Sequence, residues 1–248
     1  MSLITISFLS FLEYTCMHCP KQFLSKTTLR RHCQMKHFML SNSLASVNID
    51  TQKGIFMVAT QKSGLIAPIH VQKHVTKPLT SSCSNQECSD IMQAAGLCNP
   101  SVECDHLEAI KTAQPTELVC LQEHLLDQLV KLQIFSQRTK SLCSELKLQS
   151  EVDNSPLAVY ADFESLGFSS SRKYYSVYTN EETYYCKYKR VRVTYNCDTE
   201  EWSCQCPISN SNQSCVHEAV AKWYMFEHQH EDFLQTKNRL ANILLKNT

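Results

Sequence analysis

The sequence predicts an α+β fold, in which small cysteine- and histidine-rich modules are joined by a linker and a long helical segment. Three observations support this prediction. Pairs of cysteine and histidine gather near both ends of the chain. Between them, leucines repeat at helical spacing. Near the C-terminal end, a run of β-branched and aromatic residues gives way to a second helical pattern.

The composition narrows the classes of function. The chain has 248 residues and is 43% hydrophobic, which is enough for a buried core. Its 24 basic and 24 acidic residues cancel, so nucleic acid or an anionic membrane would have to be bound by local patches. Only four glycines occur, and no glycine-rich phosphate-binding loop can be written. We therefore expect no nucleotide-dependent chemistry and no small-molecule substrate.

Cysteine usage indicates the compartment. The apolar stretch from Leu3 to Leu12 is too short to span a bilayer and lacks the flanks of a secretory signal. Without an export signal, metal binding explains the 14 cysteines better than disulfides do. We expect no membrane partner, and a reducing compartment.

Residues 14–37 form the first module, with two cysteines and two histidines at regular spacing: Cys16-x2-Cys19-x12-His32-x4-His37. Tyr14, Phe23 and Leu29 occupy the apolar positions between them. Two thiolates and two imidazoles can complete a tetrahedron around Zn²⁺, and the metal then replaces a core that so short a segment cannot build. The segment resembles the C2H2-type zinc-finger family, which implies a zinc-stabilised ββα module.

The same resemblance leaves two kinds of partner open for this finger, DNA and protein. If it docks as the DNA-binding members do, Ser25, Thr28 and Arg31 would face base edges, and Arg31 could pair with guanine. Fingers of this build also bind proteins, and a protein partner is the alternative.

The middle of the chain contains two segments. Residues 38–82 are polar and weakly patterned, which predicts a flexible linker. Residues 83–150 form a cysteine-containing helical segment. A further four-ligand metal site could come from this segment, although its spacing matches no familiar pattern, and isolated thiols are the alternative. The residues are Cys83, Cys88, Cys98, Cys104 and His106.

A helix is predicted from about Thr116 to Leu148. Its apolar residues alternate at intervals of three and four: Leu118, Leu121, Leu125, Leu132, Phe135, Leu142 and Leu146. This seam fits either a coiled-coil dimer or a helix packed on its own domain. Further apolar residues beside the seam widen the stripe and favour the second interpretation.

Residues 152–248 form the last module. The run from Tyr184 to Tyr195 predicts a strand, Tyr174 to Thr179 its hairpin partner, and the stretch from Val216 to about Leu245 a helix. The strand carries four cations interleaved with tyrosines, which fits either a surface for nucleic acid or an edge strand protected by charge. The cations are Lys187, Lys189, Arg190 and Arg192.

Between strand and helix lies a second set of ligands: Cys204-x-Cys206-x8-Cys215-x-His217. With Trp202 before it and a helix after it, the arrangement resembles the SWIM-type zinc finger over about residues 174–228. The resemblance implies a ββα module that binds zinc through these four side chains, with DNA or protein as partner. Because such modules recur in transposase-related proteins, it also implies a transposon-derived origin.

One segment resembles an enzyme motif. Val159 to Ser165 reads VYADFES, similar to the first metal-binding motif of DnaQ-like exonucleases. On one strand, Asp162 and Glu164 would point to the same side and could hold Mg²⁺. The remaining carboxylates of that family do not follow, so we expect no enzyme and keep a metal-dependent nuclease only as a remote alternative.

Together these patterns predict a zinc-binding protein of the nucleus, with C2H2-type and SWIM-type fingers, that binds nucleic acid, DNA above all, in a regulatory or transposon-derived role. The alternative is an adaptor that uses the same zinc modules to bind other proteins.

Overall fold

A computed structural model describes residues 14–16, 20–23, 25, 28, 32, 44–61, 67–73, 81–96, 103–166, 171–183, 185–207 and 215–228. The chain divides into two compact units. The smaller contains residues 1–42 and 163–169, and the larger contains residues 43–162 and 170–248. Among the described helices, none has both the length and the apolar character needed to cross a membrane.

The smaller unit begins with a short hairpin. Strand β1 (Tyr14–Thr15) pairs antiparallel with β2 (Gln22–Phe23). The backbone N–H of Cys16 donates to the carbonyl of Lys21 at 2.9 Å, which continues the pairing beyond β1. Thr28 and His32 have helical backbone.

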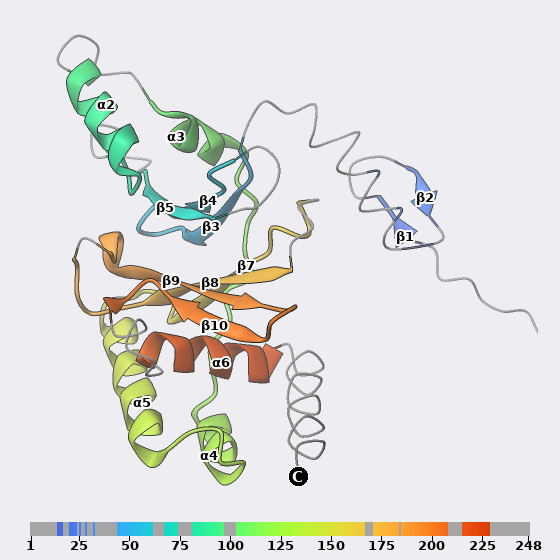
Figure 1. Ribbon diagram of the computed structural model, residues 1–248, viewed down its shortest axis with the longest axis vertical. Helices are drawn as coiled ribbons and strands as arrows, with labels where there is room; N and C mark the ends of the chain where they lie inside the picture. Colours follow the sequence, from blue (N-terminus) through green and yellow to red (C-terminus); the bar gives the residue numbers. More distant parts are fainter. Residues whose placement is uncertain are drawn as a thin grey trace, which may run out of the picture. The chain divides into compact units, whose positions relative to one another are not determined.

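The larger unit opens with a four-stranded antiparallel sheet (Figure 1). Its strands follow one another in chain order: β3 (Ser46–Asp50), β4 (Ile55–Val58), β5 (Ile69–Gln72) and β6 (Ser82–Cys83). This segment lies where the sequence predicted a linker over residues 38–82, so the prediction differs from the structure. The strands are short, and both faces of β4 are largely buried, so polar and apolar residues do not alternate clearly along it.

Helices cover one face of this sheet. They are α2 (Gln86–Gly96), α3 (Asp105–Ala109) and the single-turn helix η3 (Ile110–Thr112). Apolar side chains from β4, β5 and α3 form a small core under them, which contains Leu44, Val58, Val71, Cys83, Leu107 and Ala109.

The predicted long helix is divided into two helices, α4 (Glu123–Lys131) and α5 (Gln137–Val152). Between them Gln133 has a positive φ of 58°, and the hydroxyl of Ser136 caps α5 by accepting from the N–H of Thr139 at 3.0 Å. Buried residues of both helices join the core of their own unit, as the second interpretation of the seam predicted: Leu126, Leu129, Cys143 and Leu146. Three seam residues remain exposed: Leu118, Leu132 and Leu142.

The second sheet is also antiparallel, with strand order β10-β9-β8-β7. Its strands are β7 (Ala158–Ala161), β8 (Arg172–Tyr178), β9 (Arg190–Asn196) and β10 (Glu201–Cys204), and the single turn η4 (Lys187–Lys189) precedes β9. Strand β8 is the hairpin partner predicted for residues 174–179. Strand β9 pairs with both β8 and β10. The edge-strand interpretation of the basic run is therefore wrong.

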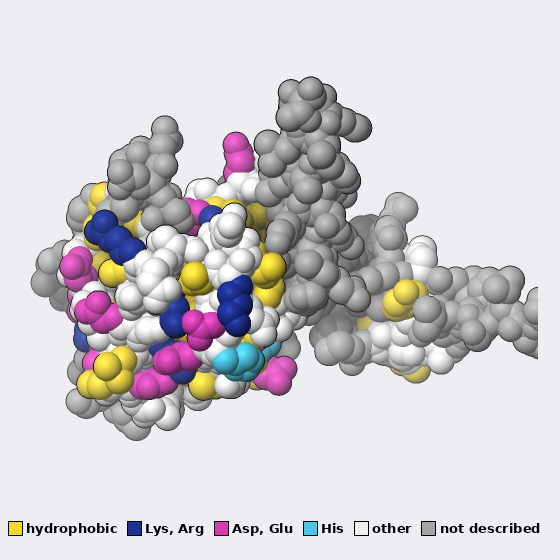
Figure 2. Space-filling view, turned by 90° about the horizontal axis from the view of Figure 1, so that it is seen from below, with side chains coloured by type: hydrophobic (Ala, Val, Ile, Leu, Met, Phe, Trp, Pro, Cys, Tyr) yellow, Lys and Arg dark blue, Asp and Glu magenta, His cyan; other side chains and the backbone are white. Residues whose placement is uncertain are grey.

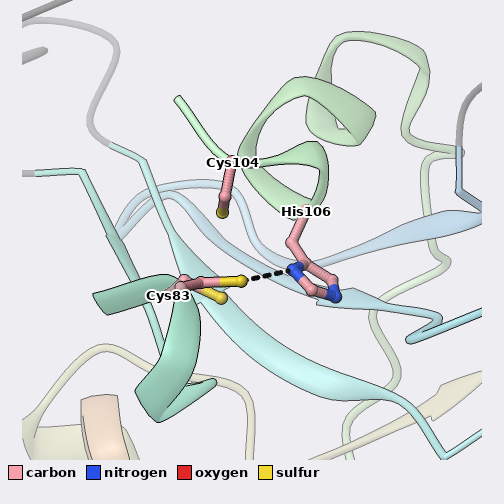
Figure 3. Close-up of side chains that lie close together, drawn as sticks. Cys83, Cys104 and His106 are labelled. Atoms are coloured by element: carbon pink, nitrogen blue, oxygen red, sulfur yellow. Dashed lines mark hydrogen bonds between the residues drawn. The ribbon is translucent and has the colours of Figure 1, made fainter. Parts of the chain in front are cut away.

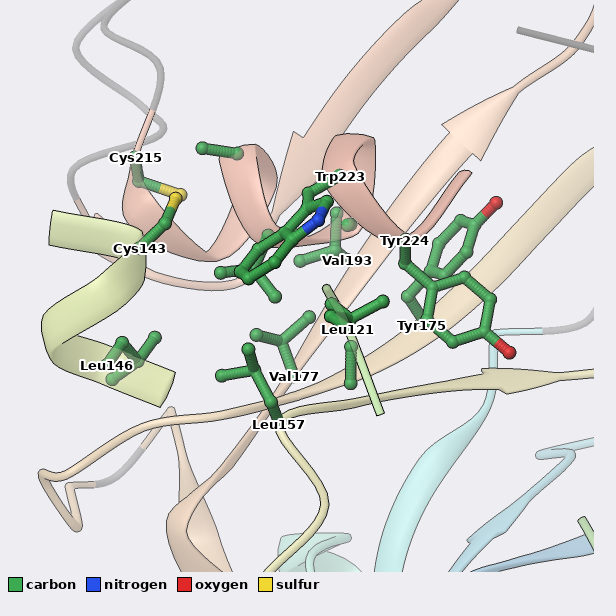
Figure 4. Packing of buried hydrophobic residues seen from close by; sticks show 14 of the residues in the cluster. Leu121, Cys143, Leu146, Leu157, Tyr175, Val177, Val193, Cys215, Trp223 and Tyr224 are labelled. Carbon is green, nitrogen blue, oxygen red and sulfur yellow. The ribbon is translucent and has the colours of Figure 1, made fainter. Parts of the chain in front are cut away.

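Helix α6 (Val216–His228) lies on one face of the second sheet, and α4 and α5 pack against it (Figure 1). Trp223 of α6 is fully buried in the core, on the side of the helix that faces Val177 and Val193 of the sheet (Figure 4). This core also takes in Cys215, immediately before α6. The strand residues and the start of the helix are thus held in one packed unit.

The two sheets pack face to face, with their helices outside (Figure 1). Polar groups join them. His70 of β5 shares a hydrogen bond of 2.9 Å with the hydroxyl of Ser176 on β8. Arg190 of β9 lies 3.6 Å from the carboxylate of Asp50 on β3.

Candidate metal centres

The C-terminal cluster contains Cys204, Cys206, Cys215 and His217, as the sequence predicted. Cys204 ends β10, Cys206 follows two residues later, Cys215 immediately precedes α6 and His217 is its second residue. One ligand atom from each residue lies within 4.8 Å of all the others. The sheet packs under α6, so the strand end and the helix start converge.

Local hydrogen bonds arrange these side chains. The sulfur of Cys215 accepts from the N–H of Glu218 at 3.4 Å, as a helix-capping side chain does. The sulfur of Cys204 accepts from the N–H of Cys206 at 3.5 Å. His217 Nδ1 is buried and has no partner among the described residues, so Nε2 is the nitrogen that faces the cysteines.

The pKa values of two thiols in this cluster, Cys204 and Cys215, shift in opposite directions. A hydrogen bond from the thiol of Cys204 lowers the pKa of Cys215 to about 4 and raises the pKa of Cys204 itself. Burial opposes a charged imidazole at His217, but hydrogen bonds to Cys206 and Cys215 outweigh it and raise its pKa to about 9. Neighbouring thiolates repel one another, and a divalent cation would relieve that repulsion for all three sulfurs.

A second cluster of the same composition lies on the first sheet. Cys83 ends β6, Cys88 is in the first turn of α2, Cys104 immediately precedes α3 and His106 is the second residue of α3. Their ligand atoms also lie within 4.8 Å of one another. Figure 3 shows the side chains of Cys83, Cys104 and His106 directed toward one another from β6 and α3.

The hydrogen bonds of this cluster follow a similar plan. The Sγ of Cys88 lies 3.4 Å from Nδ1 of His106, while Nε2 of His106 is buried without a partner among the described residues. A hydrogen bond from Cys83 lowers the pKa of Cys104 to about 4 and raises the pKa of Cys83. Of the five residues considered from the sequence, Cys98 lies outside the described residues.

Each cluster therefore offers three sulfurs and one imidazole nitrogen at a spacing that one ion can bridge. Such donor sets suit a tetrahedral, closed metal site, which leaves no open position for a substrate. Among the described residues, two Cys/His clusters could therefore hold a metal ion.

The N-terminal finger is described only in part. Cys16 is buried, and the ring of Phe23 packs on that of His32 with centroids 4.7 Å apart. Cys19 and His37 lie outside the described residues, and so does Arg31. Ser25 and Thr28 are exposed, and the hydroxyl of Ser25 accepts from the N–H of Thr28 at 3.1 Å.

Most cations of the basic run near β9 form hydrogen bonds with other groups of the protein. Arg190 is 1% exposed, and its guanidinium donates to the hydroxyl of Ser155 at 2.8 Å. Arg192 donates to the carbonyl of Pro68 at 2.6 Å, and Lys189 to the carboxylate of Asp153 at 2.7 Å. The run is therefore not the open cationic strand that the first interpretation assumed.

Surface charge is mixed elsewhere too. Figure 2 shows a face on which basic and acidic side chains are interspersed. Ion pairs link α4 and α5: Lys140 with Asp127, and Lys147 with Glu123.

Sequence reasoning missed a polar hollow on the second sheet. The hollow has a volume of about 460 Å³. Alternate residues of β8 and β9 contribute to it, because they point to the same face. Its lining includes Arg172, Tyr174, Arg192, Asn196, Glu201 and Trp202. Arg172 lies outside the basic run, so the spacing of cations along one strand could not have found it.

The nuclease motif does not lie on one strand. Strand β7 ends at Ala161, so Asp162 and Glu164 both follow it, and Glu164 belongs to a turn. The alternation that would bring two strand carboxylates to one side does not apply to them. Among the described residues, neither belongs to a Cys, His, Asp or Glu group placed to hold a metal.

In comparisons with known proteins, no family model, no curated protein and no solved structure matched this chain.

Proposed function

We propose that this chain is a zinc-binding protein whose C-terminal module, organised by Cys204, Cys206, Cys215 and His217, binds nucleic acid. The observation that carries the zinc assignment is the convergence of these four ligand atoms within 4.8 Å. Three thiolates and an imidazole favour zinc over magnesium or calcium, which prefer oxygen ligands.

The zinc would be structural. The four protein ligands fill a tetrahedral site, and they tie the end of β10 to the start of α6. Binding energy at such a site becomes folding energy, because the ligands do not converge in the unfolded chain.

The N-terminal finger adds a separate zinc site in this proposal. Its ligands would be Cys16, Cys19, His32 and His37. The buried position of Cys16 and the packing of Phe23 on His32 support it, since both are what a metal-centred hairpin needs.

Zinc stoichiometry tests the metal assignment. Native mass spectrometry of the full chain should show that Cys204→Ser loses one zinc relative to the wild type. Cys120→Ser changes an exposed cysteine away from both clusters and should lose none. An unchanged zinc count in Cys204→Ser would refute the C-terminal centre.

The hollow on the second sheet supports nucleic acid as the partner. Arg172 can pair with phosphate oxygens, and Tyr174 lies in the same lining. Arg192, whose guanidinium also donates to the carbonyl of Pro68, adds positive charge to the hollow. The volume of the hollow lies within the range found for binding sites of small molecules, nucleotides included. In the smaller unit, Ser25, Thr28 and Arg31 of the finger would contribute base contacts, and a nuclear location would follow from a DNA partner.

Salt dependence tests the partner. Fluorescence anisotropy with a labelled double-stranded DNA should show binding to the zinc-loaded chain that weakens as salt increases, because phosphate contacts release counterions. Arg172→Gln should weaken binding and reduce the slope of log K against log salt by about one. Arg138→Gln removes the same charge from the exposed surface of α5 and should change neither.

Two results would overturn this assignment. If the zinc-loaded wild type does not bind DNA at low salt, the adaptor function replaces it, and the zinc modules would bind protein. If Arg172→Gln and Arg138→Gln weaken binding equally, the hollow is not the site.

A further inference from the structure

The two sheets and their metal clusters follow one plan. Each sheet has its strands in chain order, all antiparallel, as β3-β4-β5-β6 and as β7-β8-β9-β10. In each, the first cysteine of the cluster is the last residue of the fourth strand, Cys83 in β6 and Cys204 in β10.

The other end of each cluster matches as well. Cys104 immediately precedes α3 and His106 is its second residue; Cys215 and His217 have the same places at α6. Helix α3 packs on the third and fourth strands of its sheet, and α6 packs on the third and fourth strands of its own as well as on the first two. The order of ligands along the chain is Cys, Cys, Cys, His in both clusters.

The clusters differ in the place of the second ligand. In the first sheet the second ligand, Cys88, lies in the first turn of helix α2, whereas Cys206 comes just two residues after Cys204. The imidazole also differs, since His106 presents Nδ1 and His217 presents Nε2. Both nitrogens serve as zinc ligands, so neither difference changes the donor set.

The alternative for the first cluster is ordinary packing of buried thiols. Cys83 fits that description, because it is 2% exposed and belongs to the small apolar core. His106 does not, because its imidazole is buried among three sulfurs and its Nε2 has no partner among the described residues. Nδ1 of this ring faces the sulfurs, 3.4 Å from that of Cys88, and is the atom that a bound zinc would take as its ligand.

We infer that Cys83, Cys88, Cys104 and His106 bind a further structural Zn²⁺, so that the larger unit contains two copies of one module, each a four-stranded meander closed by a Cys₃His centre. The inference goes beyond the proposed function and does not depend on a nucleic-acid partner. In this arrangement the metal joins β6, α2 and α3, each of which supplies or immediately follows a ligand.

Zinc counting on the full chain tests the inference. Native mass spectrometry should show one zinc lost in Cys104→Ser, one lost in Cys204→Ser and two lost in the double variant. Cys120→Ser and Cys98→Ser should both keep the wild-type count, because the four ligands of the first cluster are complete without them. Loss of zinc in Cys98→Ser, or none in Cys104→Ser, would overturn the ligand set.

A conservative variant covers the case in which Cys104→Ser does not fold. Cys104→His keeps a zinc ligand at that position and should keep both the zinc count and the fold; loss of a zinc by the folded Cys104→His protein would count against the inference. The Cys204→Ser result is independent of this one. Failure at Cys104 with success at Cys204 would remove the second centre and leave the proposed function intact.

Discussion

At the scale of single residues, burial decides what ionisable side chains do. His70 lies in the layer between the two sheets, 5% exposed, against Ser176 and near Arg190 and Arg192. Burial first, and then the two arginines, lower its pKa to about 3. The imidazole is therefore neutral in the folded protein at neutral pH.

This environment makes stability depend on pH. The pKa of His70 is lower in the folded chain than the 6.5 of an unperturbed histidine, so the unfolded state takes up the proton first. The contribution is fully present above pH 6.5 and is lost as the pH falls from there toward 3. Between pH 7 and pH 5 the loss should be about 2 kcal/mol.

Urea unfolding of the wild type and of His70→Gln at both pH values measures this effect. Glutamine keeps a hydrogen-bonding group for Ser176 but does not titrate. Zinc ligands also take up protons in acid, and they do so in both proteins, so the difference between the two pH dependences isolates His70. Identical pH dependences would show that His70 titrates normally.

At the scale of elements, strand pairing and helix packing determined which interpretation of each sequence pattern was correct. The seam over residues 116–148 predicted helix correctly within Glu123–Lys131 and from Gln137 onward, but residues 116–122 are not helical. Burial of Leu126, Leu129 and Leu146 supports packing within the chain. Its continuity was not predictable, because the leucines of two successive helices can share one spacing when both face the same core. The positive φ at Gln133 marks the break, at a residue with no strong preference for that conformation.

The basic run shows the same limit. A strand with cations on both faces can lie at a sheet edge or bind an anion, and the spacing of residues cannot separate the two. In the structure β9 is a central strand. Arg190 pairs with Asp50 of the first sheet, and Arg192 donates to the carbonyl of Pro68 in the segment that leads into β5. Those groups are more than a hundred positions away in the sequence, beyond any local pattern.

At the scale of the whole larger unit, a buried ion pair joins the sheets. Asp50 is 2% exposed, and its carboxylate accepts from the hydroxyl of Ser155 at 2.7 Å as well as facing Arg190. Burial lowers the pKa of Arg190 to about 10, which leaves it charged at neutral pH. A charge removed from one side of this pair leaves the other buried without compensation.

We therefore expect Arg190→Met to destabilise the chain by roughly 3 to 5 kcal/mol, since Asp50 would keep an unpaired buried charge. The double variant Arg190→Met with Asp50→Asn should lose less than the sum of the single variants, because it removes both charges. Urea unfolding at constant free zinc gives these values, with Arg138→Met on exposed α5 as the control. Additive losses would mean that the two residues do not interact across the sheets.

The sequence by itself determined the chemistry of the C-terminal centre. Close spacing, Cys-x-Cys and Cys-x-His, places each pair of ligands on one short piece of backbone, so strand, cluster and helix could be read in order. It also predicted the β8–β9 hairpin, whose alternating apolar residues are local information.

Only the tertiary structure decided the rest. The ligands of the first cluster are spread from Cys83 to His106, and they become one site because β6, α2 and α3 fold back on the same sheet. The segment expected as a linker became strands because its two faces are buried by different partners, helices on one side and the second sheet on the other. The spacing of residues along a short segment cannot predict contacts between segments that are distant in the sequence. The first metal cluster and the first sheet both depend on such contacts.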